Sequence, residues 1–274
     1  MDQATTQSRV ALRPLDSRSD YAQCAELQRQ TWGRNFTEVV PPAMLMISQK
    51  VGGVSVGAFD SADNLVGFIY GISGVRDGRR AHWSHMLAVQ PHMEGRGLGK
   101  RLKCYQRQLL LENGIEVAFW TYDPLVARNA HLNLNKLGAH VIRYVTDMYG
   151  EDTGSDLHSG LGTDRLIVQW ELADPLVERI LAGDRDDHGY SDGTPIVNAD
   201  ADGLPVQPDL TDNSAVRIEI PEDIQLLKSN AAERALAWRD TTRRAFLSYL
   251  DRGLSVTGFH RDPTTRRCFY ALST

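Results

Sequence analysis

A glycine-rich turn between a strand and a helix constrains the fold of this chain more than any other segment. Residues 82–89 read HWSHMLAV and predict a strand, and glycines follow at positions 95, 97 and 99. A helix is predicted at 97–112, so the turn leads directly into it. Glycine lets a backbone turn sharply and approach a ligand, and the free N–H groups at a helix start attract anions. The segment therefore predicts a phosphate-binding turn at a strand–helix junction.

Basic side chains follow the turn along the predicted helix. They recur at intervals of 4, 3 and 4 residues, which places them on one helical face. A polyphosphate on the turn would meet this row of cations, although the whole chain has a net charge of −5. The alternative is a solvated amphipathic helix that follows a tight turn. The predicted basic face comprises Arg96, Lys100, Lys103 and Arg107, and the predicted apolar face comprises Leu98, Leu102, Tyr105 and Leu109.

Two common nucleotide-binding motifs do not fit this turn. A dinucleotide-binding fingerprint needs the spacing G-x-G-x-x-G, whereas the glycines here follow G-x-G-x-G. A Walker loop needs Ser or Thr after its lysine, whereas Lys100 is followed by Arg101. The acidic net charge also disfavours a general nucleic-acid binder, which needs a basic surface. Neither motif therefore explains the turn.

The other segments of the first 183 residues predict a mixed sheet flanked by helices, which is an α/β (α+β) fold class. Strands are predicted at 10–12, 54–60, 64–73, 82–89, 115–122, 140–149 and 165–172. Helices are predicted from Ser19, as a possible N-cap, to Trp32, and then at 42–49, 97–112 and 127–138.

The remainder of the chain has a different character. Residues 184–214 contain 8 of the 35 acidic residues and three prolines, which predicts an acidic surface linker. We therefore divide the chain into a main domain at 1–183, this linker and a small α/β appendage at 215–274. The appendage would extend the sheet, form a homodimer contact or cover a substrate site. Its predicted elements are a strand at 216–220, a helical stretch at 222–252 and strands at 255–260 and 266–272.

The glycine-rich turn resembles the central signature of the GNAT superfamily of acyl-CoA-dependent N-acyltransferases, Q/R-x-x-G-x-G/A. Residues 94–99 read EGRGLG and match both glycines. Glu94 stands where Gln or Arg is usual, so we expect Glu94 to turn outward and Arg96 to supply the positive charge. The second family block, a strand followed by an Asn- and Ala-containing helix that ends in Gly, resembles residues 120–138. Further segments, including VRIEIP and AWRDTTRRAF in the appendage, resemble a bacterial subgroup of predicted acetyltransferases with a C-terminal extension.

This resemblance implies a GNAT-like, mostly antiparallel mixed sheet and an acyl-CoA-dependent N-acyltransferase. The acceptor amine would attack the thioester directly in a ternary complex. Acetyl-CoA is the expected donor, and a longer acyl-CoA such as succinyl-CoA is the alternative. The backbone at Leu87–Val89 would pair with the pantetheine arm, and the N–H of Leu87 or Ala88 would polarise the thioester carbonyl. The residues implied to bind the cofactor are Leu87, Ala88, Val89, Gly95, Arg96, Gly97, Leu98, Gly99, Lys100, Arg128 and Asn129. For Asn129 the alternative is a helix N-cap.

Two kinds of side chain are candidates for the proton transfers. His85 matches the position of a base histidine in the arylalkylamine branch of the superfamily, and imidazole transfers protons near neutral pH. The alternative for His85 is a hydrogen-bonded core histidine. His82 lies an odd number of residues away and is expected on the opposite strand face. Many family members carry a Tyr acid where this chain has Leu134. Tyr144 and Tyr149 are either substitutes for that acid or structural tyrosines.

The acceptor is expected to be a small-molecule amine or an amino acid, with a protein substrate as the alternative. By resemblance, Trp32 and Phe36 occupy the usual acceptor-lid region. Asp123 follows a strand at its C-terminal end, where it would hold a substrate ammonium or close the turn that Pro124 enforces. A non-catalytic CoA-binding regulatory protein is the rival from another class, favoured by Glu94 and by the missing tyrosine.

We expect no metal, nucleic acid or membrane as a partner. The eight histidines are scattered without ligand spacing, and the three cysteines are far apart and odd in number. No apolar run approaches the roughly 20 residues that a membrane-spanning helix needs. The first residues, MDQATTQSRV, lack the apolar region of a secretory signal. A reducing cytoplasm is the expected compartment.

Overall fold

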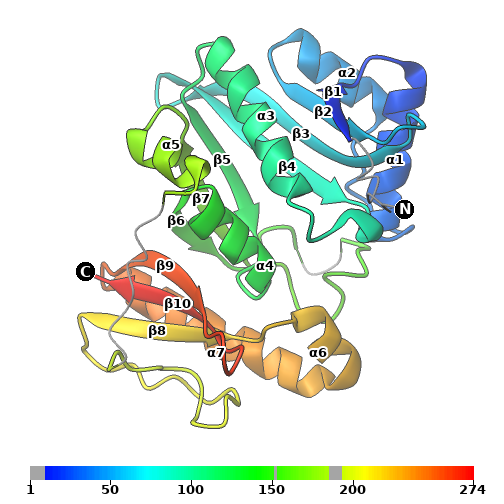
Figure 1. The fold of residues 1–274 in the computed structure, drawn as a ribbon. Helices are drawn as coiled ribbons and strands as arrows, with labels where there is room; N and C mark the ends of the chain where they lie inside the picture. Colours follow the sequence, from blue (N-terminus) through cyan, green and yellow to red (C-terminus); the bar gives the residue numbers. More distant parts are fainter. Residues whose placement is uncertain (1–9, 151–152, 185–192) are drawn as a thin grey trace, which may run out of the picture. The chain divides into compact units, whose positions relative to one another are not determined.

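The computed structural model describes residues 10–150, 153–184 and 193–274, which form two compact units (Figure 1). The first unit comprises Met1–Phe119 with Gly154–Asp156, and the second comprises Trp120–Thr153 with Leu157–Thr274. Of the predicted linker, residues 185–192 lie outside the described residues. Among the described residues, no helix combines the length and the apolar character that crossing a membrane requires.

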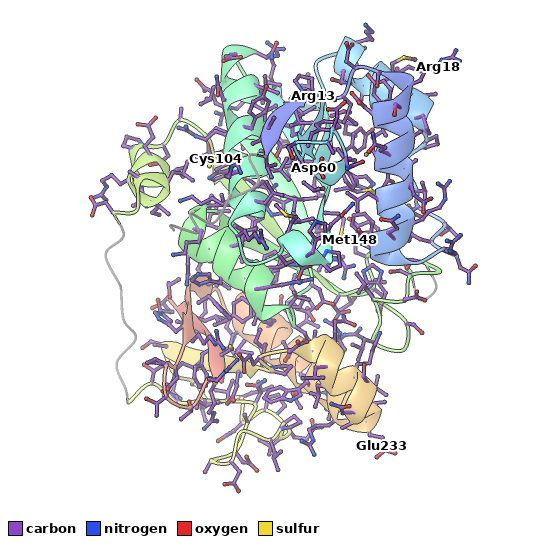
Figure 2. The ribbon with its side chains drawn as sticks, turned by 45° about the vertical axis from the view of Figure 1, so that its right-hand side comes forward. Arg13, Arg18, Asp60, Cys104, Met148 and Glu233 are labelled. Carbon is purple, nitrogen blue, oxygen red and sulfur yellow. The ribbon has the colours of Figure 1, made fainter. Side chains whose placement is uncertain are left out.

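The first unit is built on five neighbouring strands in the order β1-β2-β3-β4-β5. The pairs from β1 to β4 are antiparallel, and β5 pairs with β4 in parallel through His82–Ala118 and Trp83–Phe119. The elements are β1 (Ala11–Pro14), α1 (Arg18–Trp32), α2 (Pro42–Lys50), β2 (Val54–Phe59), β3 (Leu65–Arg76), β4 (Arg79–Val89), the 3-10 helix η1 (Pro91–Met93), α3 (Leu98–Glu112) and the start of β5 (Val117–Tyr122). Cys104 lies half-buried on α3 (Figure 2).

Helix α1 begins earlier than the sequence predicted. Ser17, rather than Ser19, is the N-cap, because its side chain accepts a hydrogen bond from the Asp20 N–H at 3.0 Å. The Asp20 carboxylate accepts a hydrogen bond from the Ser17 N–H, so the two residues form a capping box. The apolar side of α1 then packs on β3 and β4 through a core that includes Cys24, Leu27 and Phe68.

The β3–β4 pair contains one irregularity that matters for the site. Tyr70 is opposite Met86 and Gly71 is opposite Ser84, so His85 is an extra residue in β4 without a partner in β3. Such a β-bulge disrupts the ladder locally and re-aims side chains. The bulge therefore changes which residues of β4 point to each face of the sheet.

The second unit contains the end of β5, which is followed in the main sheet by β7 and then β6. It also contains a separate antiparallel sheet with the strand order β8-β10-β9. The mixed, mostly antiparallel sheet with flanking helices confirms the predicted fold class. Because β8, β9 and β10 form their own sheet, the appendage does not extend the main one. The elements are α4 (Ala127–Ala130), the π-helix η2 (His131–Lys136), β6 (His140–Val145), β7 (Arg165–Glu171), α5 (Pro175–Ala182), β8 (Ala215–Ile220), α6 (Ile224–Asn230), α7 (Ala232–Asp251), β9 (Ser255–Arg261) and β10 (Cys268–Ser273).

Several boundaries in the second unit differ from the sequence prediction. The helical stretch predicted at 222–252 is two helices, because Ala231 takes an extended conformation with φ −155° and ψ 71°. The helix predicted at 127–138 continues from α4 into a π-helix, and Gly138 follows it with φ +69°. Helix α5 was not predicted. Helix α7 buries one row of side chains at helical spacing, which comprises Ala235, Trp238, Thr242, Phe246 and Tyr249.

The predicted linker is not a surface segment throughout. Val197 and Asn198 are buried, and the Asn198 amide exchanges two hydrogen bonds with the backbone of Glu219 on β8. This polar pairing compensates for the desolvation of Asn198, which composition alone does not reveal. The boundaries of the two compact units also differ from those of the predicted segments 1–183, 184–214 and 215–274. The division into a main domain, a linker and an appendage stays a prediction.

Candidate functional site

The sequence-predicted site residues divide between the two units. Each group is described within its own unit. The first unit holds Trp32, Phe36, His85, Leu87, Ala88, Val89, Gly95, Arg96, Gly97, Leu98, Gly99 and Lys100, and the second holds Asp123, Arg128, Asn129 and Tyr144.

The glycine-rich turn has the backbone that an anion site requires. Gly95 and Gly97 take positive φ values of +72° and +73°, which side chains other than glycine rarely adopt. A Cβ at either position would meet nothing within 4 Å, so glycine serves the conformation there rather than a lack of space. Gly97 is the N-cap of α3 and makes no side-chain cap hydrogen bond. The first N–H groups of α3 therefore have no hydrogen-bond acceptor from an N-cap side chain.

The predicted basic face of α3 needs one correction. Lys103 is buried, and its Nζ donates a hydrogen bond to Ser84 Oγ at 2.9 Å on β4. Desolvation holds the pKa of this ammonium well below its usual value. Arg96 is exposed and Lys100 is half-buried, so these two remain near the turn as solvent-accessible cations. Regular helical spacing predicted the face, but it did not show that the sheet lies under Lys103.

His82 lies beside Lys103 on the α3 side of the sheet. Its ring nitrogens are 3.0 Å from Ser73 Oγ and 3.0 Å from Gln106 Nε2, and the side chain is fully buried. Burial and the Lys103 charge lower the pKa of His82 to about 3. His82 is therefore a neutral core histidine. It lies on the opposite face from His85, as predicted.

His85 occupies the bulge of β4 on the other side of the sheet. Its ring meets the Tyr70 ring edge-on with 6.1 Å between centroids, and Tyr70 belongs to the core under α1 and α2. Met86 and Ala88, which follow the bulge, belong to the same core. Burial lowers the pKa of His85, and the negative charge of Glu38 opposes this effect. A half-buried, predominantly neutral imidazole is a proton acceptor near neutral pH.

An aromatic row leads from His85 to the loop after α1. We define this row as Phe36, Trp32, Phe68, Tyr70 and His85. Trp32 stacks on Phe36 with centroids 5.6 Å apart and meets Phe68 edge-on at 6.3 Å. Phe68 and Tyr70 are two residues apart on β3 and so share one face. Trp32 and Phe36 are half-buried, so the outer end of the row reaches solvent.

The loop at 33–40, which carries Phe36 and Glu38, is fastened to the first unit. The buried Gln28 amide accepts from the Val40 N–H at 2.7 Å and donates to the Val40 carbonyl at 3.3 Å. The Asp156 N–H donates to the Trp32 carbonyl at 3.0 Å. Gly154 lies so close to the carbonyl of Asn35 that a Cβ there would collide with it. The loop is thus held from both ends.

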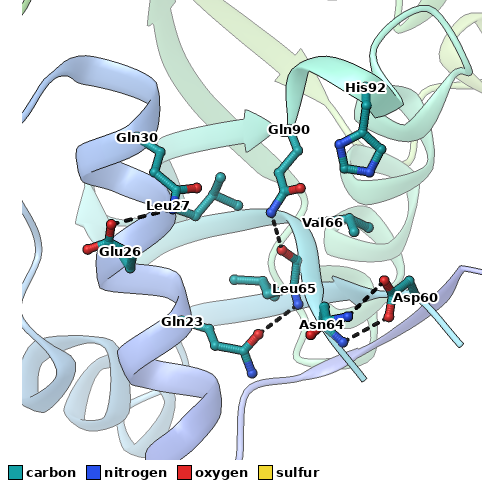
Figure 3. Close-up of a pocket in the computed structure, with 10 residues that line it drawn as sticks. All are labelled: Gln23, Glu26, Leu27, Gln30, Asp60, Asn64, Leu65, Val66, Gln90 and His92. Atoms are coloured by element: carbon teal, nitrogen blue, oxygen red, sulfur yellow. Dashed lines mark hydrogen bonds between the residues drawn. The ribbon is translucent and has the colours of Figure 1, made fainter. Parts of the chain in front are cut away.

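A separate polar pocket of about 420 Å³ lies between α1, the β2–β3 turn and the end of β4 (Figure 3). Several of its side chains are occupied by backbone groups: Gln23 accepts from the Leu65 N–H and Gln90 donates to the Leu65 carbonyl, both at 2.9 Å. Asp60 accepts from the backbone and side chain of Asn64. These bonds account for the shape of the pocket and leave its chemistry unassigned.

In the second unit, the geometry favours the structural alternative for Tyr144. Its buried hydroxyl donates a short hydrogen bond to Asp164, and its ring stacks on Phe246 with centroids 5.5 Å apart. Arg243 also donates to Asp164, at 2.6 Å. Burial and the adjacent carboxylate raise the pKa of Tyr144 well above its usual value. We therefore do not assign the proton transfer to Tyr144.

Asp123 is also engaged within the second unit. One carboxylate oxygen accepts from the Leu125 N–H at 2.9 Å, which closes the turn, and the other accepts from Arg239 Nη2 at 2.6 Å. This favours the turn role over the binding of a substrate ammonium. Asn129 is not a helix cap, because Val126 is the N-cap of α4. Arg128 is exposed and Asn129 is half-buried, and their predicted cofactor contacts stay predictions.

Sequence reasoning missed Tyr70 and Gln28. Along β4, the even-numbered positions change from the polar His82 and Ser84 to the apolar Met86 and Ala88. Even-numbered residues of a regular strand share one face, so this change of polarity was a usable signal for the bulge. Gln28 gave no comparable signal, because its role depends on the path of the loop.

Comparisons with known proteins find solved structures of low sequence identity. No family model matches the sequence, and no curated protein matches it. The ribosomal-protein-S18-alanine N-acetyltransferase from Escherichia coli is 14% identical, with 67% of this chain and 100% of that chain covered and a TM-score of 0.46. An aminoglycoside 6'-acetyltransferase type Ii is 19% identical, with 60% and 98% covered and a TM-score of 0.47. The NatC complex bound to Gag peptide and CoA is 16% identical, with 60% and 98% covered and a TM-score of 0.47. Likenesses at this level carry no argument for function.

Replacing Gly154 with alanine should loosen the loop at 33–40. We expect Gly154→Ala to lower the free energy of unfolding by about 3 kcal/mol, because it adds a collision with Asn35 to the strain of φ +65°. Gly150→Ala is the matched control, because Gly150 has φ +77° with nothing within 4 Å. The control should cost only about 1 kcal/mol, from backbone strain. Equal losses in urea titrations would show that the Asn35 contact does not fasten the loop.

Proposed function

We propose that the protein is an acyl-CoA-dependent N-acyltransferase, with acetyl-CoA as the donor and an amine of a small molecule as the acceptor. One observation carries this proposal. The β4 strand presents the unpaired His85 on the aromatic side and then runs into an uncapped glycine turn at the start of α3. A proton acceptor and an anion-binding turn thus lie on one continuous segment.

The donor would bind along the end of β4 and the glycine turn. The first N–H groups of α3, with Arg96 and Lys100 nearby, suit the pyrophosphate of CoA. The pairing of β4 with β5 in the first unit comprises His82 and Trp83 and precedes the bulge. Leu87–Val89 pair with β3 along one edge, and their second edge suits the amide groups of a pantetheine arm.

The proposed reaction needs one proton acceptor at the amine. His85 would take a proton from the acceptor ammonium, after which the nitrogen lone pair forms the new C–N bond to the thioester carbonyl carbon. The C–S bond breaks as the carbonyl re-forms, CoA leaves as a thiolate, and the nitrogen releases its second proton to solvent as the neutral amide forms. A thiol has an ordinary pKa of about 8.5, so the thiolate can leave and then take up a proton from solvent. This route does not require the tyrosine acid that Leu134 replaces.

A CoA-binding regulatory protein without catalysis is the second candidate. It is favoured by the buried Leu134 at the usual tyrosine position and by the hydrogen bond that occupies Tyr144. Both candidates bind CoA, so turnover of the thioester separates them.

Binding of CoA should depend on Lys100 but not on Lys103. We expect Lys100→Ala to weaken the affinity for CoA roughly fivefold, because it removes a cation beside the phosphate turn. Lys103→Met should keep the dissociation constant within about twofold, because Lys103 Nζ bonds Ser84 under the helix. Titration calorimetry with CoA measures both. If the wild-type protein does not bind CoA, or if the two variants lose affinity equally, the assignment of this turn is wrong.

The pH dependence of turnover should report the ionisation of His85. The value of kcat/KM should fall as the pH drops through the pKa of His85, because the base is then protonated. Burial places that pKa below the ordinary value of 6.5. His85→Gln should lower kcat by about 10² to 10⁴ and remove the acid limb of the profile. His92→Gln, an exposed histidine on η1, is the control and should leave the limb in place. An unchanged profile in His85→Gln would exclude His85 as the base.

A further inference from the structure

We propose that the end of the β3–β4 hairpin holds a binding site for a small aromatic anion of the aryl carboxylate class. The site is an apolar hollow of about 160 Å³, and all of its lining residues belong to the first unit. It shares no lining residue with the polar pocket of Figure 3. The inference goes beyond the proposed acyl transfer and does not rest on it.

The hollow lies on one face of three neighbouring strands. Ile72 of β3 is opposite Trp83 of β4, and Trp83 is also the register partner of Phe119 of β5. Residues in register on adjacent strands point to the same face, so these three apolar side chains form a row across the sheet. Trp83 packs against the buried Phe119, whereas Ile72 is 49% exposed. The row therefore opens to solvent at its β3 end.

A pair of small residues beside this row makes the hollow. Gly74 and Ala81 are opposite each other, two positions from Ile72 and Trp83, and so lie on the same face. A Cβ at Gly74 would meet nothing within 4 Å, so the space beside the row stays open. Gly74 lies within β3 and its φ is outside the left-handed region, so the backbone does not require glycine there. What the glycine provides is the space.

The size and the lining of the hollow suit one aromatic ring. An apolar cavity of about 150 Å³ takes up benzene, and the hollow beside Gly74 is of that size. The rings of Trp83 and Phe119 line it. Aromatic side chains favour offset or edge-on contacts with a further ring, so a flat ligand gains more here than a compact aliphatic one.

Arg76 supplies a positive charge at the rim of the hollow. Its guanidinium Cζ lies 4.3 Å from the centroid of the Phe119 ring, which places the cation beside the apolar row. A guanidinium on a ring face keeps its N–H groups in its own plane, where they match the two oxygens of a carboxylate. Arg76 Nε also lies 3.5 Å from Asp77 Oδ2, but both side chains are exposed, and such a surface ion pair contributes little.

A second arginine makes an anion favourable at the same rim. Arg79 is the register partner of Arg76, and like charges directly opposite each other on two strands repel. Arg79 Nη2 lies 3.9 Å from Glu116 Oε2, and both of these side chains are exposed as well. A bound anion would reduce the repulsion between the arginines. The hollow and its rim together therefore favour a ligand with one aromatic ring and one negative charge.

The test uses three probes of the same size in fluorine NMR titrations: 4-fluorobenzoate, the neutral 4-fluorobenzyl alcohol and the cationic 4-fluorobenzylamine. We expect 4-fluorobenzoate to bind with a dissociation constant of about 0.1 to 1 mM, which is typical of a ligand with so few atoms. The alcohol should bind about fivefold more weakly and the amine at least about tenfold more weakly. Equal affinity for the benzoate and the amine, or no binding of the benzoate, would overturn the inference.

Two variants remove the two features of the site separately. Gly74→Val fills the hollow at a strand position where valine is favoured, and it should weaken the binding of 4-fluorobenzoate at least about tenfold. Arg76→Gln keeps the hollow, so it should weaken 4-fluorobenzoate about fivefold while the alcohol changes less than about twofold. Unchanged affinity for the benzoate in either folded variant would contradict the assignment.

Arg80→Gln is the matched control. Arg80 is opposite Val75, one position from the pair of Arg76 and Arg79, and so projects from the other face of the hairpin. This variant removes the same charge as Arg76→Gln but should keep the dissociation constant of 4-fluorobenzoate within about twofold. An equal loss in both arginine variants would show that net charge, and not this site, attracts the probe. Displacement of the probe by CoA would place it at the glycine turn and would also overturn the inference.

Discussion

The bulge at His85 in β4 is the constraint on which the rest of the first unit depends. Before the bulge, His82 and Ser84 point to the α3 side, where they meet Gln106 and Lys103. After it, Met86 and Ala88 at positions of the same parity point into the core under α1 and α2. One inserted residue thus lets a single strand present polar groups to one helix layer and apolar groups to the other.

The two histidines of β4 lie in different electrostatic environments. His82 is buried beside Lys103. Desolvation and the Lys103 charge lower the pKa of His82 so far that it stays neutral across the physiological range. His85 is half-buried and meets the Tyr70 ring edge-on; burial lowers its pKa, and the negative charge of Glu38 opposes this effect. Two histidines three residues apart therefore have different chemistry, because burial, hydrogen bonding and neighbouring charge set a pKa more strongly than residue type.

The fold was largely predictable from local patterns, whereas the site was predictable only in part. Alternating apolar residues located every strand of the main sheet, and Gly97 marked the start of α3, because both signals are local in sequence. Lys103 was wrongly predicted to belong to the basic face of α3, because helical spacing carries no information about the strand beneath the helix. Asp123 and Tyr144 were candidates for substrate binding and proton transfer, with structural roles as the alternatives. Arg239 and Asp164 bond to them from other parts of the sequence, which favours the structural roles. Gln28 was missed for the same reason, since its two hydrogen bonds to Val40 depend on the path of the loop.

We propose that His85, which has no ladder partner in β3, and the glycine turn after β4 serve one acyl transfer. The most direct test measures thiol and amide in the same reaction, using acetyl-CoA labelled in the acetyl group and a cationic amine. We expect one labelled amide for each thiol released, at a rate that depends on the amine concentration. Release of thiol without labelled amide, or CoA binding without any release above the uncatalysed rate, would contradict it.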